Sequence, residues 1–218
     1  MGKVHSLFEI SGKVGDYVFY ELNGQQVIRK APSKKKGPKT EAQKSVALQN
    51  TEFGKASSAG KMLRVALAEE CSQLHDRYLY QRVSKLMLRL KSCDGAPIGS
   101  RTVQGGLTTA EGQAALANFH FQKVQKNFPQ LLNAVYRQGN LCLSLFFAKD
   151  ADFAITELQI NFETRKFRRY KHGLPEVEKG TPFSLKKGFR HKKGFTDLLM
   201  ISGAGFLQGV VVTADRNK

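Results

Sequence analysis

The spacing of apolar residues changes near residue 131, and this change restricts the possible folds more than any other feature of the chain. Before it, apolar residues recur at helical spacing over residues 41–67 and 69–90. The sequence Thr-Thr-Ala-Glu at residues 108–111 is a capping box, which predicts a short helix ending near residue 119. After it, apolar residues and glycine turns predict short strands at residues 141–147, 152–162, 167–170, 181–185, 198–201 and 206–213. We therefore predict an α+β protein with two to three helices followed by an antiparallel β-sandwich or barrel-like sheet.

An Asn-Gly pair at residues 23–24 predicts a β-hairpin near the N-terminus. It separates residues 16–22, which are aromatic and β-branched, from a second strand-like run at residues 25–30. A type I′ turn needs φ > 0 at both central residues, and Asn and Gly tolerate this best. Residues 31–39 then contain two prolines and four lysines, so we expect an extended, solvated basic linker. Thr40, with Gln43 three residues later, predicts the start of the first helix.

The length of 218 residues fits one large domain or two small ones. We expect two modules. Residues 1–138 hold the β-hairpin, the basic linker and the helical region, and residues 139–218 form the antiparallel β domain, with the boundary near Gln138-Gly139. The alternative is one shared core in which the N-terminal hairpin joins the C-terminal sheet, because an isolated two-stranded hairpin is marginally stable in water.

Positive charge is in large excess, since 35 Lys and Arg against 18 Asp and Glu give a net charge of +17. An excess of this size favours an anionic partner. The basic residues concentrate in the linker and in residues 164–196, where Phe and Tyr are interleaved with Lys and Arg. Cations neutralise phosphates and aromatic rings stack on bases, so this mixture is typical of nucleic-acid binders. The candidate polyanion-binding residues are Lys34, Lys35, Lys36, Lys39, Arg165, Lys166, Arg168, Arg169, Lys171, Lys186, Lys187, Arg190, Lys192 and Lys193. The other interpretation is a sheet with aromatic residues inside and solvated lysines outside.

Enzyme motifs are missing from the sequence. It contains no Gly-x-x-x-x-Gly-Lys-Ser/Thr loop and no Gly-x-Ser-x-Gly elbow. Gly203-Ala204-Gly205 resembles the start of a dinucleotide fingerprint, but the next glycine comes one residue late, so a turn between strands is the better interpretation. His75 and Asp76 are adjacent on a predicted helix, where neighbouring residues do not face each other. We expect a non-enzymatic protein with no catalytic residue and no cofactor.

Three cysteines without framework spacing indicate a reducing compartment. Cys71 and His75 are four residues apart and would share a helix face, so they could bind a metal together with Cys93 or His120. A closed zinc site needs four ligands and only two are local, so we expect no metal site. The N-terminus has no apolar signal region, and residues 198–212, the longest apolar stretch, are too short to span a bilayer. These features predict a cytoplasmic protein with no membrane association.

The N-terminal third carries an ordered set of motifs. They are Ser-Gly-Lys-Val-Gly at residues 11–15, the hairpin with Asn23-Gly24, Val27-Ile28-Arg29, and Pro-Lys-Thr-Glu-Ala-Gln at residues 38–43. Together they resemble a family of uncharacterised small basic proteins found mainly in Bacteroidetes and in phage-like elements of such bacteria. The resemblance covers residues 11–67. It implies a bacterial or phage-associated, non-enzymatic protein, and it implies no site residues.

We therefore predict a basic binding or assembly protein that docks on nucleic acid or on a nucleoprotein surface. The alternative is a self-assembling structural component of a phage-like particle or tail, in which the linker lies across a neighbouring subunit and the hairpin adds to its sheet edge. The expected partner is nucleic acid or another polyanion in the first case and a second copy of the chain in the second. The expected location is the cytoplasm or a virion-like assembly.

Overall fold

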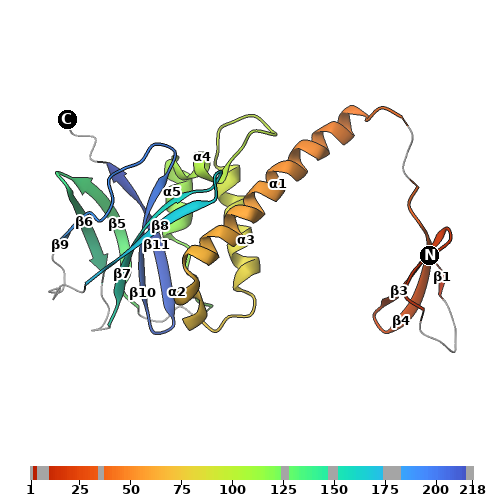
Figure 1. Cartoon of the computed structure of the whole chain (residues 1–218), viewed down its shortest axis with the longest axis horizontal. Helices are drawn as coiled ribbons and strands as arrows, with labels where there is room; N and C mark the ends of the chain where they lie inside the picture. The colour runs from red at the N-terminus through yellow and green to blue at the C-terminus, as the bar shows by residue number, and fades with distance from the viewer. Residues whose placement is uncertain are drawn as a thin grey trace. The chain divides into compact units, whose positions relative to one another are not determined.

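The structure is a computed structural model that describes residues 2–3, 10–33, 37–123, 128–146, 152–173 and 183–214. Within these residues an N-terminal sheet is followed by five helices and a curled C-terminal sheet, so the predicted α+β class is confirmed (Figure 1). Contacts divide the chain into two units, residues 1–40 and residues 41–218.

The first unit is a four-stranded sheet. Its strands are β1 (Gly2–Lys3), β2 (Gly12–Val14), β3 (Tyr17–Leu22) and β4 (Gln25–Lys30), in the order β1-β4-β3-β2. The predicted hairpin is confirmed, since β3 and β4 pair up to Leu22 and Gln25 around a turn in which Asn23 and Gly24 have φ of 53° and 75°. Among the described hydrophobic residues of this unit, Val27 is the one that is buried. This sheet is therefore a single layer that buries little apolar surface of its own.

The helices of the second unit partly follow the prediction. They are α1 (Glu41–Ala66), α2 (Ala68–Gln73), α3 (Leu79–Ser92), α4 (Val103–Leu107) and α5 (Ala110–Ala117). The helix predicted over residues 69–90 is wrong as one element, because His75 has a left-handed φ of 47° and ends α2. The Asp76 carboxylate then accepts a hydrogen bond from the backbone N–H of Tyr78 at 2.9 Å, just before α3 begins.

Two threonines fix the starts of the short helices. Thr109 accepts a hydrogen bond from the backbone N–H of Gly112, which confirms the helix start predicted near residue 109. Thr102 caps α4 in the same way through Gly105, and this helix was not among those predicted. The described part of the chain thus has five helices where two to three were expected.

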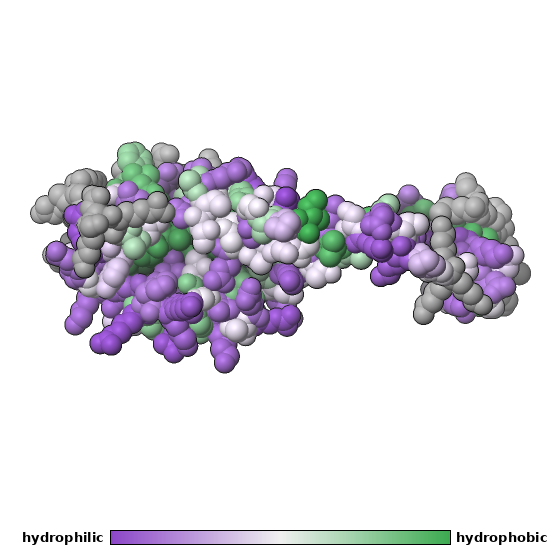
Figure 2. Space-filling view, turned by 90° about the horizontal axis from the view of Figure 1, so that it is seen from above, coloured by the Kyte–Doolittle hydropathy of each residue, from purple (hydrophilic) through white to green (hydrophobic). Residues whose placement is uncertain are grey.

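The first half of α1 carries almost no buried side chain. Burial along this helix begins at Glu52, and Val46, Leu48 and Phe53 expose about half of their surface. Figure 2 shows hydrophobic residues gathered on this part of α1.

The C-terminal sheet is mixed rather than wholly antiparallel. Its strands are β5 (Gln130–Arg137), β6 (Asn140–Phe146), β7 (Ala154–Asn161), β8 (Lys166–His172), β9 (Phe183–Lys186), β10 (Thr196–Gly203) and β11 (Phe206–Ala214), in the order β8-β7-β10-β11-β5-β6-β9. Each sequential hairpin is antiparallel, but β11 meets β5 in parallel, with Val212 opposite Ala134. This pairing joins β8-β7-β10-β11 to β5-β6-β9, and no local signal in the sequence encodes it.

The helices and the C-terminal sheet share one core. Alternate residues of β10 point to opposite sides: Leu198 and Met200 pack among the helical side chains, whereas Leu199 and Ile201 pack inside the curl of the sheet. The helices lie on one side of the sheet (Figure 1). Gln138 and Gly139, where a domain boundary was predicted, form the turn between β5 and β6, and the two units divide at Thr40.

Gly106 in α4 packs directly against the backbone of α3. A Cβ atom at this position would lie 1.7 Å from the carbonyl oxygen of Leu90. We expect Gly106→Ala to lower the free energy of unfolding by at least about 2 kcal/mol, because backbone atoms move aside only if the helices shift. Gly54 is the matched control, since a Cβ atom there meets nothing within 4 Å. Gly54→Ala should raise the free energy of unfolding by up to about 1 kcal/mol. Urea unfolding measures both, and a Gly106→Ala protein as stable as the parent would contradict this packing.

Candidate polyanion-binding surface

Strand β8 forms one edge of the C-terminal sheet and is the most basic strand of the chain. Lys166 and Arg168 lie opposite Asn161 and Gln159 of β7 and so point to the inside of the curl. Arg169 and Lys171 lie opposite Leu158 and Thr156 and point to the helical side. The edge strand therefore carries positive charge on both faces.

The segment after β9 returns across the inner face of β7 and β8. The side-chain amides of Gln159 and Asn161 donate to the carbonyl oxygens of Arg190 at 3.0 Å and Gly194 at 2.6 Å. The ring of Phe189 lies edge-on to the ring of Tyr170, with centroids 6.2 Å apart. The structure thus brings together the two basic clusters that are about twenty residues apart in sequence.

These clusters leave a set of exposed cations on adjoining segments, namely the β7–β8 turn, β8 and the segment after β9. We call this set the β8 surface, and it consists of Arg165, Lys166, Arg168, Arg190, Lys192 and Lys193. Aromatic rings lie among the charges: Tyr170 is about half exposed, and the Lys192 ammonium sits 5.0 Å from the centre of the Phe195 ring. This is the mixture of cations and stacking rings that single-stranded nucleic acids bind to.

Two buried carboxylates hold the returning segment in place. Glu157 is fully buried and accepts from the backbone N–H groups of Gly188 at 2.8 Å and Phe189 at 3.3 Å. Asp197 accepts from the Lys187 ammonium at 2.6 Å and from the amide of Gln159 at 2.9 Å. Burial by itself would raise the pKa of Asp197, but the hydrogen bonds from Lys187 and Gln159 outweigh it and hold the pKa below its ordinary value.

Two of the predicted binding residues have intramolecular partners instead. Lys187 has a side chain that is only 5% exposed and is bound to Asp197. The Arg169 guanidinium contacts the buried carboxylate of Glu70 at 2.7 Å and the exposed one of Glu69 at 3.3 Å. Both residues tie the fold together, so we leave them out of the binding surface.

The other predicted residues are dispersed. Lys171 is exposed on the helical side of β8, Lys186 is exposed at the end of β9, and Lys39 is exposed in the first unit. Lys34, Lys35 and Lys36 lie outside the described residues.

A groove next to the β8 surface was not predicted. It has a volume of about 670 Å³ and lies between α1, the start of α4 and the β7–β8 turn. Four cations line it, Lys55, Lys91, Arg101 and Arg165, against the single carboxylate of Glu163. These cations come from four separate segments, so neither spacing nor composition could have indicated the groove.

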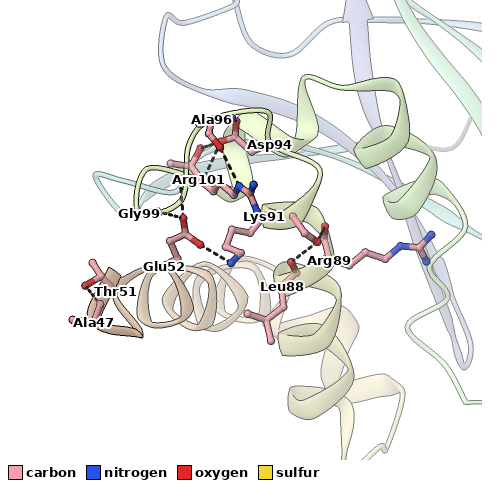
Figure 3. A network of polar contacts seen from close by, with 12 residues as sticks. Ala47, Thr51, Glu52, Leu88, Arg89, Lys91, Asp94, Ala96, Gly99 and Arg101 are labelled. Carbon is pink, nitrogen blue, oxygen red and sulfur yellow. Dashed lines mark hydrogen bonds and ion pairs between the residues drawn. The ribbon is translucent and has the colours of Figure 1, made fainter. Parts of the chain in front are cut away.

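A buried ion pair organises one wall of this groove (Figure 3). Glu52 is 1% exposed and accepts from the Lys91 ammonium at 2.7 Å and from the backbone N–H groups of Gly99 at 2.5 Å and Arg101 at 3.3 Å. The hydrogen bond from Lys91, helped by the two backbone donors, lowers the pKa of Glu52 despite its burial. The Arg101 guanidinium donates in turn to the carbonyl oxygen of Ala96 at 3.0 Å. The loop that carries Arg101 is therefore held at both its backbone and its side chain.

The cysteines show no arrangement for metal binding. Burial raises the pKa of the Cys71 thiol to about 11, and this side chain packs against the core. Across the described ranges, no three His, Cys, Asp or Glu side chains are grouped so as to hold a metal ion. In the same residues no helix is long and apolar enough to cross a membrane.

Comparison with known proteins finds no match: no family model, no curated protein and no solved structure matches this chain. The resemblance of residues 11–67 to a Bacteroidetes family stays a prediction.

The pairing of Arg169 with Glu70 makes a prediction about stability. Arg169→Ser should lower the free energy of unfolding by about 2 kcal/mol, because it leaves the buried Glu70 carboxylate without its cation. Arg168→Ser is the matched control on the same strand, where the side chain is exposed, and should change stability by less than about 0.5 kcal/mol. Chemical denaturation compares the two variants, and equal stabilities would show that the ion pair holds nothing together.

The lowered pKa of Glu52 predicts the direction of a pH effect. Glu52→Gln should lower the free energy of unfolding by about 3 kcal/mol at neutral pH, because Lys91 loses its buried partner. Since folding depresses the Glu52 pKa, its contribution is present above the pKa of the unfolded chain and is lost as the pH falls through the folded value. The difference from the parent should therefore be largest above about pH 5 and shrink in acid. Glu41→Gln removes an exposed carboxylate from the same helix and serves as the control. If the difference in free energy of unfolding between Glu52→Gln and the parent stays the same in acid, the stabilising role of the ionised Glu52 carboxylate is contradicted.

Proposed function

We propose that this chain is a non-enzymatic nucleic-acid-binding protein that uses the β8 surface to contact phosphates. The observation that carries the proposal is the convergence of two basic clusters on one exposed face, beside aromatic rings. Phosphate contacts dominate the affinity of such proteins and need positive charge rather than a catalytic constellation. The net charge of +17 adds a long-range attraction to the same partner.

The hydrogen bonds and ion pairs around the β8 surface support binding of an anionic partner there, rather than a surface whose charges are only solvated. The two buried carboxylates beneath the β8 surface, Glu157 and Asp197, are occupied by backbone N–H groups, Lys187 and Gln159. In the described residues, none of the six cations of the β8 surface forms an ion pair with Asp or Glu. Their charge is left for a partner outside the chain.

A second candidate function is supported by the first unit. Its single-layer sheet exposes Val14, Tyr17 and Leu22 and buries only Val27 among its described hydrophobic residues, so it lacks the hydrophobic face that makes a small sheet stable on its own. In a self-assembling structural component, a neighbouring subunit would supply the missing contact surface. A nucleoprotein or virion-like assembly would combine both roles.

Nucleic-acid binding can be tested by its salt dependence. Replacing Lys166, Arg168, Lys192 and Lys193 with Ser should lower the affinity for single-stranded DNA and reduce the slope of log K against log salt by about 3, since each phosphate contact on a single strand contributes about 0.7. The control replaces Lys44, Lys61, Arg77 and Lys85, which are exposed elsewhere and change the net charge equally. Its slope should stay close to that of the parent. Fluorescence anisotropy at several salt concentrations measures the affinity and the slope. Equal losses of affinity and slope in both variants would mean that the β8 surface has no special role.

A further inference from the structure

We infer that the groove beside the β8 surface holds one unstacked nucleotide of a single-stranded nucleic acid whose backbone continues along that surface. The inference rests on the proposed function and adds which form of nucleic acid is bound and where a base is placed. It assigns a role to Lys55, Arg101 and Arg165, two of which sequence patterns did not single out.

The size and lining of the groove suit a nucleotide. Its volume of about 670 Å³ lies within the range of small-ligand sites, roughly 300–1,000 Å³. The lining combines the cations with the hydroxyl-bearing Thr51 and Ser58 and the aromatic Phe162. In the part of the chain that the structure describes, Lys55 and Arg165 form no ion pair with a carboxylate. Phosphate, sugar and base would each find a group of matching chemistry.

The groove is formed before any ligand arrives. Lys91 and the loop that carries Arg101 are fixed by Glu52, as Figure 3 shows. On the opposite wall, the side-chain amide oxygen (Oδ1) of Asn161 accepts from the backbone N–H groups of Glu163 at 3.0 Å and Thr164 at 2.7 Å. These bonds hold the β7–β8 turn, in which Arg165 has a left-handed φ of 55°. A site ordered in advance loses little conformational entropy on binding.

The groove is continuous with the β8 surface. Arg165 lines the groove and is followed directly by Lys166 of β8. From the other side, the Gln104 side chain, which also lines the groove, donates to the carbonyl oxygen of Gly194 at 3.0 Å, next to Lys193. A nucleic-acid strand that leaves the groove would therefore contact the cations of the β8 surface directly.

This geometry favours a single strand over a duplex. A stacked and paired base presents only its edge, so a groove between helices can take a base only from a strand that is free to unstack. The exposed Tyr170 beside the cations offers a further ring for an unpaired base. A duplex would meet the cations of the β8 surface but leave the groove empty.

Filling the groove without changing any charge tests the inference. A Cβ atom at Gly54 meets nothing within 4 Å, so Gly54→Phe places a ring in the groove, and Gly54→Ala is the matched control that adds one methyl group. Fluorescein-labelled oligothymidylate and a duplex of equal length are titrated with the full-length parent and both variants. We expect Gly54→Phe to weaken single-strand binding by about tenfold, leave duplex binding unchanged, and give a melting temperature no lower than that of the parent. Gly54→Ala should bind as the parent does.

A second variant and a third ligand complete the experiment. Thr51→Phe fills the same groove from an exposed position and must show the same selective loss. If the parent binds neither nucleic acid at low salt, the proposed function is wrong. If the parent binds both forms equally and neither variant changes this, nucleic-acid binding stands and the groove inference is wrong. Thymidine monophosphate that binds as tightly as the oligonucleotide would also overturn it, because the groove would then be a site for free nucleotides.

Discussion

The carboxylate of Glu157 lies fully buried on the inner face of the sheet, where it accepts hydrogen bonds from the backbone N–H groups of Gly188 and Phe189. The same device recurs through the second unit. Glu52 fixes the loop that carries Arg101, Asp94 accepts from the backbone N–H of Thr102 at 2.7 Å at the start of α4, and Asp197 holds Lys187. Loops that could not be positioned by apolar packing are positioned by these acceptors, because a buried carboxylate left without donors would be very costly.

This use of carboxylates explains where the positive charge of the molecule is found. The chain has few acidic residues for its size, and several of them are inside, bound to backbone N–H groups or to single cations. Within the described residues, the six cations of the β8 surface form no ion pair with Asp or Glu and lie at the surface. These cations collect on β8 and on the segment after β9 because three side chains of β7, Glu157, Gln159 and Asn161, form hydrogen bonds with the backbone of that segment and hold it against β8. The same hydrogen bonds from β7 thus position the segment after β9 and place its cations beside those of β8.

Features with a local physical cause were predictable from the sequence, and those that depend on distant partners were not. The turn at Asn23-Gly24 and the capping of α5 by Thr109 follow from backbone and side-chain geometry within four residues. The break at His75 is different, because it follows from the burial of Asp76, which pairs with Arg82 and Lys123 further along the chain. The clustering of basic residues in residues 164–196 was visible in the sequence. That Arg169 and Lys187 are bound to Glu70 and Asp197 could be seen only after folding.

The edges of the C-terminal sheet bear on the choice between the two candidate functions. An edge strand has unpaired backbone groups that can recruit a strand from another molecule, and charged residues on the edge are a common protection. Here one edge is β8, with Lys or Arg pointing to both faces, and the other is the four-residue β9, which ends at the exposed Lys186. A second copy of this chain brings the same positive charge to either edge and is repelled, whereas a polyanion is attracted. The charges that disfavour strand addition at β8 are therefore the same charges that would attract a nucleic acid there under the proposed function.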